Sequence, residues 1–208
     1  QMQTGKSASA VDLTPLLSRR LLFVTGKGGT GKTTVTAALA RLAARQGLRT
    51  LVCEMDAKGS LAHALGARIP GYDAVEVEPN LHAMVMDTEA SLREYLSIHA
   101  RIPFLGSFTP LANVLDYVAD AAPGVREILS IGKVCWEVRE NHYDLVIVDA
   151  EASGHIVSQV ASPRVINGLV LRGPLRDQTK WMLDILEDHT RTGVLVVSTP
   201  EELPVTES

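Results

Sequence analysis

The glycine-rich segment at residues 26–33 constrains the fold of this chain more than any other feature. It reads Gly-Lys-Gly-Gly-Thr-Gly-Lys-Thr and fits the pattern G-x-x-x-x-G-K-[ST], whose small residues let backbone N–H groups turn inward around phosphate oxygens. The apolar run Leu21–Thr25 precedes it, and the Ala/Leu-rich stretch Thr33–Arg45, closed by Gly47, follows it. A strand, a phosphate-binding loop and a helix are therefore predicted, with the loop at the helix N-terminus, which favours an anion.

This loop predicts a site for ATP and Mg²⁺. Lys32 is placed to reach the β- and γ-phosphates, and the hydroxyl of Thr33 is placed to ligate Mg²⁺. A glycine-rich turn that merely joins a strand to a helix is the alternative. The residues expected to bind the nucleotide are Gly26, Lys27, Gly28, Gly29, Thr30, Gly31, Lys32, Thr33 and Thr34.

Apolar runs at regular intervals predict the rest of the sheet. Beyond the first strand, the candidates are Thr50–Glu54, Leu81–Met86, Leu145–Val148 and Gly193–Ser198. The interval between the first two strands is long enough for a helical crossover, so the sheet begins parallel. Because strands alternate with helices, including one at Leu175–His189, we expect an α/β fold: a doubly wound, mostly parallel sheet of the P-loop NTPase type with a helical insertion.

One domain is expected over residues 19–208. Its helical insertion is expected at about residues 88–140, because Ser91–Glu140 has a mostly helical pattern broken at Pro103, Gly106, Pro110 and Pro123. Residues 1–18 are polar and rich in small residues, with no sustained period. We expect them to form a disordered arm or a cloning remnant.

Charge and composition exclude several classes of function. Twenty Lys and Arg against 24 Asp and Glu leave a net charge of −4, so no basic field is available to hold nucleic acid or anionic lipid. Two cysteines far apart in sequence, Cys53 and Cys135, favour a reducing compartment. No apolar run reaches the length that spans a bilayer. Together with the cysteines, this leads us to expect a cytoplasmic protein. The net charge leads us to expect no nucleic-acid partner.

Lys27 and two later segments resemble one family of ATPases. Lys27, in K-G-G-x-G-K-T, resembles the deviant Walker A motif of the dimeric ATPases of partition, septum positioning, nitrogenase iron protein and arsenite pumping. Asp149, followed by Ala-Glu-Ala-Ser-Gly-His, resembles the switch II stretch D-T-A-P-T-G-H of the arsenite-pump and tail-anchored-protein-targeting ATPases. Asp56, in D-A-K-G-S-L, resembles their switch I stretch D-P-A-H-S-L. The chain thus resembles a bacterial member of the anion-transporting, arsenite-pump-type ATPases.

The resemblance implies an Mg²⁺-dependent ATP hydrolase that acts as a nucleotide-switched dimer, either a homodimer or a heterodimer with a related ATPase. Its implied catalytic residues are Asp56, which orients the attacking water, Lys27, which reaches the partner's nucleotide, and Lys32. Asp149 would hold Mg²⁺ through a water. The alternatives are a solvated loop lysine for Lys27, a turn-initiating residue for Asp149 and the N-cap of a helix at Ala57–Leu65 for Asp56.

Departures from the family pattern keep other functions open. Ala57 and Gly59 replace the switch I Pro and His, and switch II differs at residues 151–153. A nucleotide-binding switch or client-binding module with little turnover therefore remains an alternative. A partition or septum ATPase would need a basic or amphipathic surface, and a small-molecule kinase would not need Lys27. Two isolated cysteines do not form the soft thiolate cluster that arsenite would require.

The insertion and the end of the chain carry the last expectations. In the targeting branch the corresponding helices form a groove for hydrophobic clients, so the resemblance implies a hydrophobic client or a membrane-protein partner; ordinary packing is the alternative. The apolar residues concerned are Phe104, Leu105, Phe108, Leu111, Val114, Leu115 and Val118. The family's adenine-reading residue and closing helices follow the strand predicted at Gly193–Ser198 and its loop. The domain is therefore expected to be C-terminally incomplete.

Overall fold

A mostly parallel sheet forms the centre of the protein. The computed structural model describes residues 12–99, 125–151, 153–169 and 174–200. Its strands run in the order β3-β4-β2-β5-β1-β6, and every neighbouring pair is parallel except β3 and β4, which are antiparallel. Within these ranges the strands are β1 (Leu21–Thr25), β2 (Thr50–Glu54), β3 (Val75–Glu78), β4 (Leu81–Val85), β5 (Leu145–Asp149) and β6 (Thr192–Val196).

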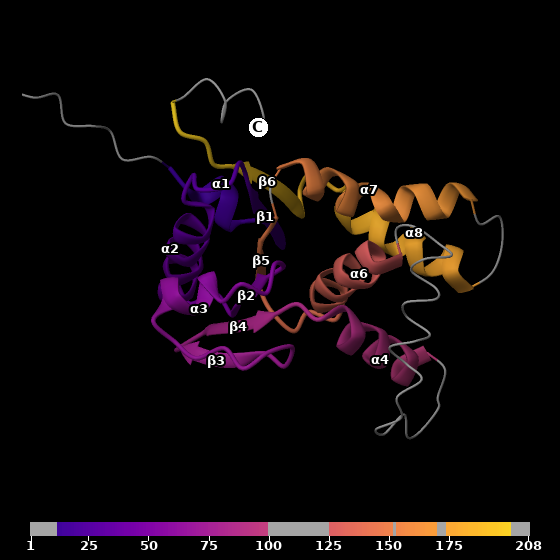
Figure 1. The fold of residues 1–208 in the computed structure, drawn as a ribbon, viewed down its shortest axis with the longest axis horizontal. Coiled ribbons are helices and arrows are strands. Elements are labelled where there is room, and N and C mark those ends of the chain that lie inside the picture. The colour runs from indigo at the N-terminus through magenta and orange to yellow at the C-terminus, as the bar shows by residue number, and fades with distance from the viewer. Residues whose placement is uncertain (1–11, 100–124, 152, 170–173, 201–208) are drawn as a thin grey trace, which may run out of the picture.

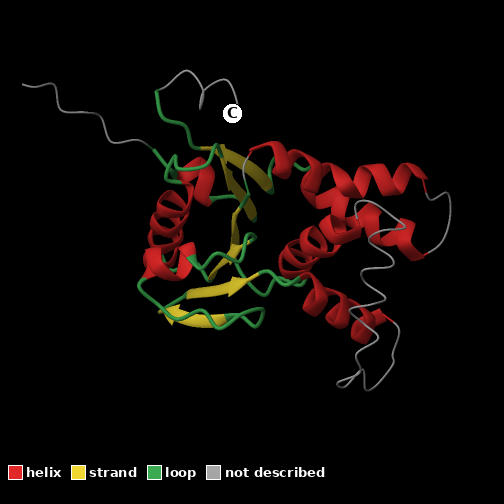
Figure 2. Ribbon diagram, in the orientation of Figure 1, coloured by secondary structure: helices red, strands yellow, loops and turns green. Residues whose placement is uncertain are grey.

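Helices cover both faces of this sheet. Figure 1 shows α1, α2 and α3 on one side of the strands and α6, α7 and α8 on the other, and Figure 2 shows the strands between the two groups. The doubly wound α/β fold of the P-loop NTPase type, predicted from the sequence, is confirmed. The helices are α1 (Thr14–Leu17), α2 (Lys32–Arg45), α3 (Ser60–Leu65), α4 (Thr88–His99), α6 (Val125–Arg139), α7 (Ser153–Leu169) and α8 (Pro174–Leu186).

The central strands are buried on both faces, which explains their unbroken apolar sequences. In β1, Leu21 and Phe23 lie in the core cluster under α6, whereas Leu22 and Val24 lie in the cluster under α2. The strand β5 alternates in the same way. Since successive side chains of a strand point to opposite faces, both faces of such a strand must be apolar.

The helix α2 follows the phosphate loop and packs closely on the sheet. It buries a face rich in alanine, including Ala37, Ala40 and Ala44, and small side chains let its backbone approach the strands. The helix ends as predicted: Gly47 has a φ of 88°, and the N–H of Leu48 donates to the carbonyl of Ala43 at 3.1 Å. This is the left-handed helix end that glycine favours.

Beyond residue 18, two of the described elements were not predicted from the sequence. The strand β3 is a four-residue edge strand with the sequence Val-Glu-Val-Glu, so it buries too little apolar surface to give a clear pattern. The helix α7 contains Pro163, and its apolar residues do not gather on one face. The predicted strands Leu81–Met86 and Gly193–Ser198 are found at Leu81–Val85 and Thr192–Val196, and β5 also includes Asp149.

The range predicted as a helical insertion contains α4 and α6. The helix α6 packs on the sheet, since Ile131, Val134 and Cys135 are fully buried in the core cluster of that face. Lys133, only 10% exposed, ties α6 to α4: its Nζ lies 2.9 Å from Glu94 Oε1. The apolar set Phe104–Val118 lies outside the described residues, and the domain limits remain a prediction.

The N-terminal segment differs from the expected disordered arm in its last part. Residues 14–17 form the short helix α1, and Leu17 is 6% exposed and belongs to the core cluster under α2. Burial of this leucine fixes the chain just before it enters β1. In the described ranges, no helix combines the length and the apolar character needed to cross a membrane.

The contact between Gly26 and Val197 predicts a large effect of one added methyl group. Gly26 has a φ of 145°, and a Cβ built on it would lie 2.0 Å from the backbone oxygen of Val197. We expect Gly26→Ala to lower the free energy of unfolding by about 2 kcal/mol or more, because backbone atoms cannot move aside cheaply. Urea unfolding of the nucleotide-free protein measures the change.

The matched control is Gly28→Ala in the same loop. A Cβ at Gly28 meets no described atom within 4 Å, and we expect a change below about 0.5 kcal/mol there. Equal stability of the two variants would contradict the close approach of residues 26 and 197.

Candidate functional site

The carboxyl ends of β1, β2 and β5 meet at one edge of the sheet. The register pairs Val24 of β1 and Glu54 of β2 with Asp149 of β5. Each strand leads directly into a segment that the sequence singled out: the loop at 26–34, the loop at 55–59 and the segment after Asp149. The topology therefore gathers the predicted site residues where open α/β sheets bind ligands.

The phosphate loop is held in shape by its own side chains. Gly29 and Gly31 have φ values of 83° and 90°, a left-handed conformation that other residues adopt only with strain. The carbonyl of Lys27 accepts hydrogen bonds from Thr30 Oγ1 at 2.9 Å and from Lys32 Nζ at 3.2 Å. The ammonium group of Lys32 thus lies over the loop, at the N-terminus of α2. This arrangement of glycine backbone, helix N-terminus and cation fits a phosphate group.

Asp149 is anchored to α2 by two threonine hydroxyls. Thr33 Oγ1 donates to Asp149 Oδ2 at 2.7 Å, and Thr36 Oγ1 lies 3.2 Å from Asp149 Oδ1. Asp149 is 6% exposed, and this burial raises the pKa of its carboxyl group, while the two hydroxyls and Lys32 act in the opposite direction. A hydroxyl and a carboxylate in contact beside a phosphate loop suit Mg²⁺, which prefers oxygen ligands and keeps several waters.

Asp56 lies in the loop between β2 and α3, beside the same edge of the sheet. Its carboxylate forms an ion pair with Lys58, and both side chains are well exposed. The N-cap alternative for Asp56 is wrong, since α3 begins at Ser60 and its N-cap is Gly59, which has a φ of 75°. The functional prediction for Asp56 is not tested by this geometry.

Glu54 caps α3 in place of Asp56. Its Oε1 accepts hydrogen bonds from the backbone N–H groups of Ser60 at 2.8 Å and Leu61 at 3.3 Å. Burial raises the pKa of the Glu54 carboxyl group, and these two backbone donors oppose the shift. The cap comes from the preceding strand rather than from the residue next to the helix.

Sequence reasoning missed both Glu54 and Thr36. A carboxylate inside the buried run of β2 was a usable signal, because charged residues are rarely fully buried without a partner. Thr36 lies one turn after Lys32, whose carbonyl it also contacts at 2.9 Å, and a threonine in a helix gives no comparable signal. Its contact with Asp149 depends on the packing of α2 against β5.

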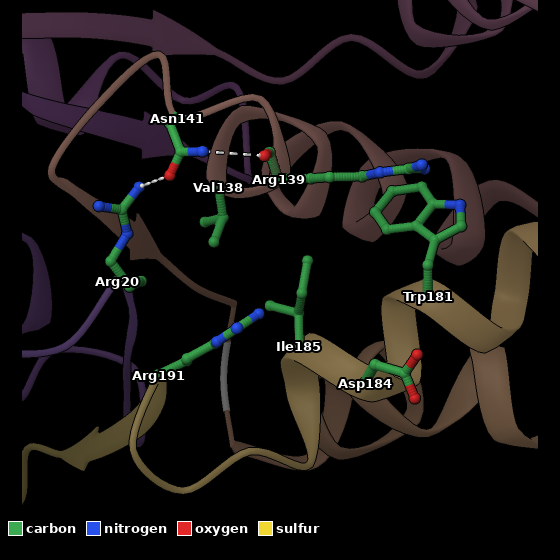
Figure 3. A pocket seen from close by; sticks show the side chains of 8 residues that line it. All are labelled: Arg20, Val138, Arg139, Asn141, Trp181, Asp184, Ile185 and Arg191. Atoms are coloured by element: carbon green, nitrogen blue, oxygen red, sulfur yellow. Dashed lines mark hydrogen bonds between the residues drawn. The ribbon is translucent and has the colours of Figure 1, made fainter.

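A separate pocket lies at the opposite end of the sheet. Figure 3 shows this cavity of about 470 Å³, lined by Arg20, Val138, Arg139, Asn141, Trp181, Asp184, Ile185 and Arg191. Its arginines already have partners within the protein: Arg20 binds Asn141 Oδ1 at 2.8 Å and Arg191 pairs with Asp188 at 3.2 Å. Arg20 precedes β1, whereas the phosphate loop follows it, so the two sites lie at opposite ends of that strand.

Both cysteines lie in the core of the protein. Cys53 and Cys135 are both buried as free thiols, and burial raises the pKa of Cys53 to about 12. Among the described residues, no group of three or more His, Cys, Asp and Glu side chains is arranged to hold a metal ion.

The fold and this site define a P-loop NTPase domain. The sequence model of the family described as anion-transporting ATPase matches residues 19–173, which is most of the chain. The chain belongs to this anion-transporting ATPase family, as its phosphate loop and the two later segments suggested.

The matches to known relatives cover most or nearly all of this chain. ATPase BagA of Mycobacterium tuberculosis is 29% identical over 217 residues, covering 99% of this chain and 64% of that protein. ATPase get3 of Schizosaccharomyces japonicus is 32% identical over 181 residues, covering 80% of this chain and 53% of that protein. ATPase get3 of Schizosaccharomyces pombe is 27% identical over 159 residues, covering 72% of this chain and 45% of that protein. The chain thus spans about two thirds or less of the length of these relatives.

The anchoring of Asp149 predicts a specific loss of stability when Thr36 loses its hydroxyl. Thr36 is fully buried, and Thr36→Val keeps its shape while removing the donor to a buried carboxylate. We expect the free energy of unfolding to fall by about 1–3 kcal/mol. Thermal or urea unfolding of the nucleotide-free protein measures it, with Thr34→Val on the exposed face of α2 as the control.

A second measurement separates the contact with Asp149 from the contact with the helix backbone. In the Asp149→Ala background, Thr36→Val should cost clearly less than in the wild type, because the carboxylate that needed the hydroxyl is gone. The same cost in both backgrounds would show that Asp149 does not depend on Thr36.

Proposed function

We propose that this protein binds and hydrolyses ATP with Mg²⁺ and that this cycle drives a nucleotide-switched dimer. The observation that carries the proposal is the contact between Thr33 and Asp149, 2.7 Å long, one residue after Lys32, whose ammonium group donates to the phosphate loop. Membership of a family of ATPases supports the same activity. The chain spans only part of its relatives, so the proposal concerns the chemistry of this domain.

Each group at the loop has a distinct role in binding. The backbone N–H groups of residues 26–34 and the ammonium of Lys32 would hold the phosphates, and the Thr33 hydroxyl would ligate Mg²⁺. Asp149 would accept a hydrogen bond from a water on the metal. When bound, Mg²⁺ would offset the charge of the phosphate oxygens.

Asp56 would orient the attacking water. Its carboxylate is a hydrogen-bond acceptor on a loop that begins beside Asp149, and its current partner is the exposed ammonium of Lys58. Exposed ion pairs contribute little, so Asp56 can leave Lys58 for a water at small cost. The closure of such loops around a γ-phosphate is a known route by which nucleotides switch proteins.

Lys27 would act on the nucleotide of a second subunit. The lysine lies in the phosphate loop and is partly exposed, and its carbonyl accepts the hydrogen bonds of Thr30 and Lys32. The partner is a second copy or a related ATPase. A hydrophobic client or a membrane protein would bind through the segment that contains Phe104–Val118, and the protein would act in the cytoplasm.

A module that binds nucleotide with little turnover is the second candidate. The observations in its favour are the altered switch I sequence, with Ala57 and Gly59 in place of Pro and His, and the ion pair that Asp56 forms with Lys58. A single-turnover measurement of ATP hydrolysis decides between the two functions. The third candidate function is that of a partition or septum-positioning ATPase. Binding of the protein to DNA or to anionic membranes would support it.

The variant Asp56→Asn tests the catalytic proposal. It keeps the shape of the side chain and removes the carboxylate, so hydrolysis should fall by roughly 10²–10⁴-fold while ATP affinity is retained. Single-turnover hydrolysis and equilibrium binding of ATP measure the two effects. In the companion variant Lys32→Ala, ATP binding itself should be lost, because the phosphate charge is no longer offset.

Two results would contradict these assignments. Hydrolysis by Asp56→Asn at the wild-type rate would remove Asp56 from the reaction. Unchanged ATP affinity in Lys32→Ala would show that the loop is not the nucleotide site.

Mixing two inactive variants tests whether Lys27 of one subunit acts at the nucleotide site of the other. Lys27→Ala and Lys32→Ala subunits should each be inactive alone, but a mixed dimer of them contains one site with both lysines. Random mixing of equal amounts should restore about a quarter of the wild-type activity, since half of the dimers are mixed and each has one intact site. If no mixing ratio restores hydrolysis, Lys27 does not act on a partner's nucleotide.

A further inference from the structure

Glu54 is a buried carboxylate that is only half satisfied. It is 2% exposed at the end of β2, a strand whose five residues are all buried. Its Oε1 accepts the N–H groups of Ser60 and Leu61, but its Oε2 has no hydrogen-bond partner in the part of the chain that the structure describes. Buried polar atoms in native proteins almost always have a partner, so this oxygen requires an explanation.

The register places this carboxylate beside Asp149. Glu54 and Asp149 are direct partners in the parallel pair β2–β5. Two residues earlier, Val52 and Ile147 both lie in the core cluster under α2, and side chains alternate along a strand. Glu54 and Asp149 therefore share the face toward α2, on strands about 4.8 Å apart.

This pair of carboxylates is electrostatically incomplete. Among the described residues the hydrogen-bond donors to them are neutral: the hydroxyls of Thr33 and Thr36 for Asp149, and backbone N–H groups at the start of α3 for Glu54. The nearby ammonium of Lys32 donates to the carbonyl of Lys27. Two carboxylates removed from water call for a cation close by, and a hydrated divalent ion can satisfy both at once, because each of its waters donates hydrogen bonds.

We propose that Glu54 is a second carboxylate of the Mg²⁺ site, accepting a hydrogen bond from a metal-bound water through Oε2 while Oε1 keeps the start of α3 in place. The proposal rests on the proposed function, in which Thr33 and Asp149 hold the metal. It adds a residue that the phosphate-loop pattern does not contain.

The proposal links the metal to the position of Asp56. Glu54 is the residue before the loop 55–59, and its carboxylate holds Ser60, the residue after that loop. One side chain therefore fixes both ends of the segment that contains Asp56. A metal that orders Glu54 through Oε2 would also order this loop, so metal binding and the placement of Asp56 would be coupled.

A purely structural cap would use only Oε1, and Glu54→Gln separates the two roles. The amide keeps the volume and the carbonyl acceptor for Ser60 and Leu61, but it loses the charge and replaces Oε2 with a donor. We expect ATP binding without metal to be unchanged. The Mg²⁺ concentration that gives half of the metal-dependent increase in ATP affinity should rise about 10–100-fold, as for other groups that hold a metal's outer ligands.

Equilibrium binding of ATP at increasing Mg²⁺ measures this shift, with Glu76→Gln, at an exposed position of β3, as the matched control. The wild type and Glu76→Gln should show the same Mg²⁺ dependence. If Glu54→Gln shows the same Mg²⁺ dependence of ATP binding as these two proteins, the role of Glu54 is overturned while the proposed function stands. If the wild type itself binds ATP without any response to Mg²⁺, both are overturned.

Hydrogen exchange of the wild-type protein gives a test that does not depend on any variant folding. The N–H groups of Ser60 and Leu61 should exchange more slowly with ATP and Mg²⁺ than with ATP alone, because the metal orders Glu54, their acceptor. Equal exchange in the two conditions would overturn the coupling. Where Glu54→Gln is folded, it should show the same exchange as the wild type in the nucleotide-free state and lose the Mg²⁺-dependent slowing.

Discussion

The parallel pairing of β1, β5 and β2 is the constraint on which the whole site depends. Thr33 and Asp149 are more than a hundred residues apart in sequence, yet they touch because β1, which leads to Thr33, and β5, which ends at Asp149, finish at the same edge. The alanine-rich face of α2 brings its backbone close enough to the sheet for Thr36 to reach the same carboxylate. Loss of register between these strands would separate the phosphate loop from its acidic partner.

The sequence predicted the elements that are buried on both faces and missed those that are not. The runs at β1, β2 and β5 are continuous because each strand is covered by helices on both sides, and their assignment as parallel strands is confirmed. The strand β3 alternates Val with Glu over four residues at the edge, where few apolar contacts are available to shape the sequence. Helix α7 was not predicted for a related reason, because its apolar residues do not gather on one face of the helix.

For the site, the pattern located single residues but not their mutual contacts. Lys32, Thr33 and Asp149 could be named in advance because a phosphate loop and the end of a central strand dictate their surroundings. The contacts of Thr36 and Glu54 could not, since they arise from packing between α2 and β5 and from a cap that crosses the loop 55–59. Asp56 shows the same limit: its side chain has the right chemistry for an N-cap, but the helix begins four residues later.

The hydrogen bond from Lys32 to the carbonyl of Lys27 has a consequence for ligand selection. Without a nucleotide the loop already supplies an acceptor for one of the three N–H donors of this ammonium group. A ligand oxygen competes with this carbonyl or binds beside it, and a neutral oxygen forms no stronger hydrogen bond than the carbonyl does. A phosphate oxygen carries a formal charge and forms the stronger bond. We therefore expect the loop to favour anions over uncharged molecules of similar shape.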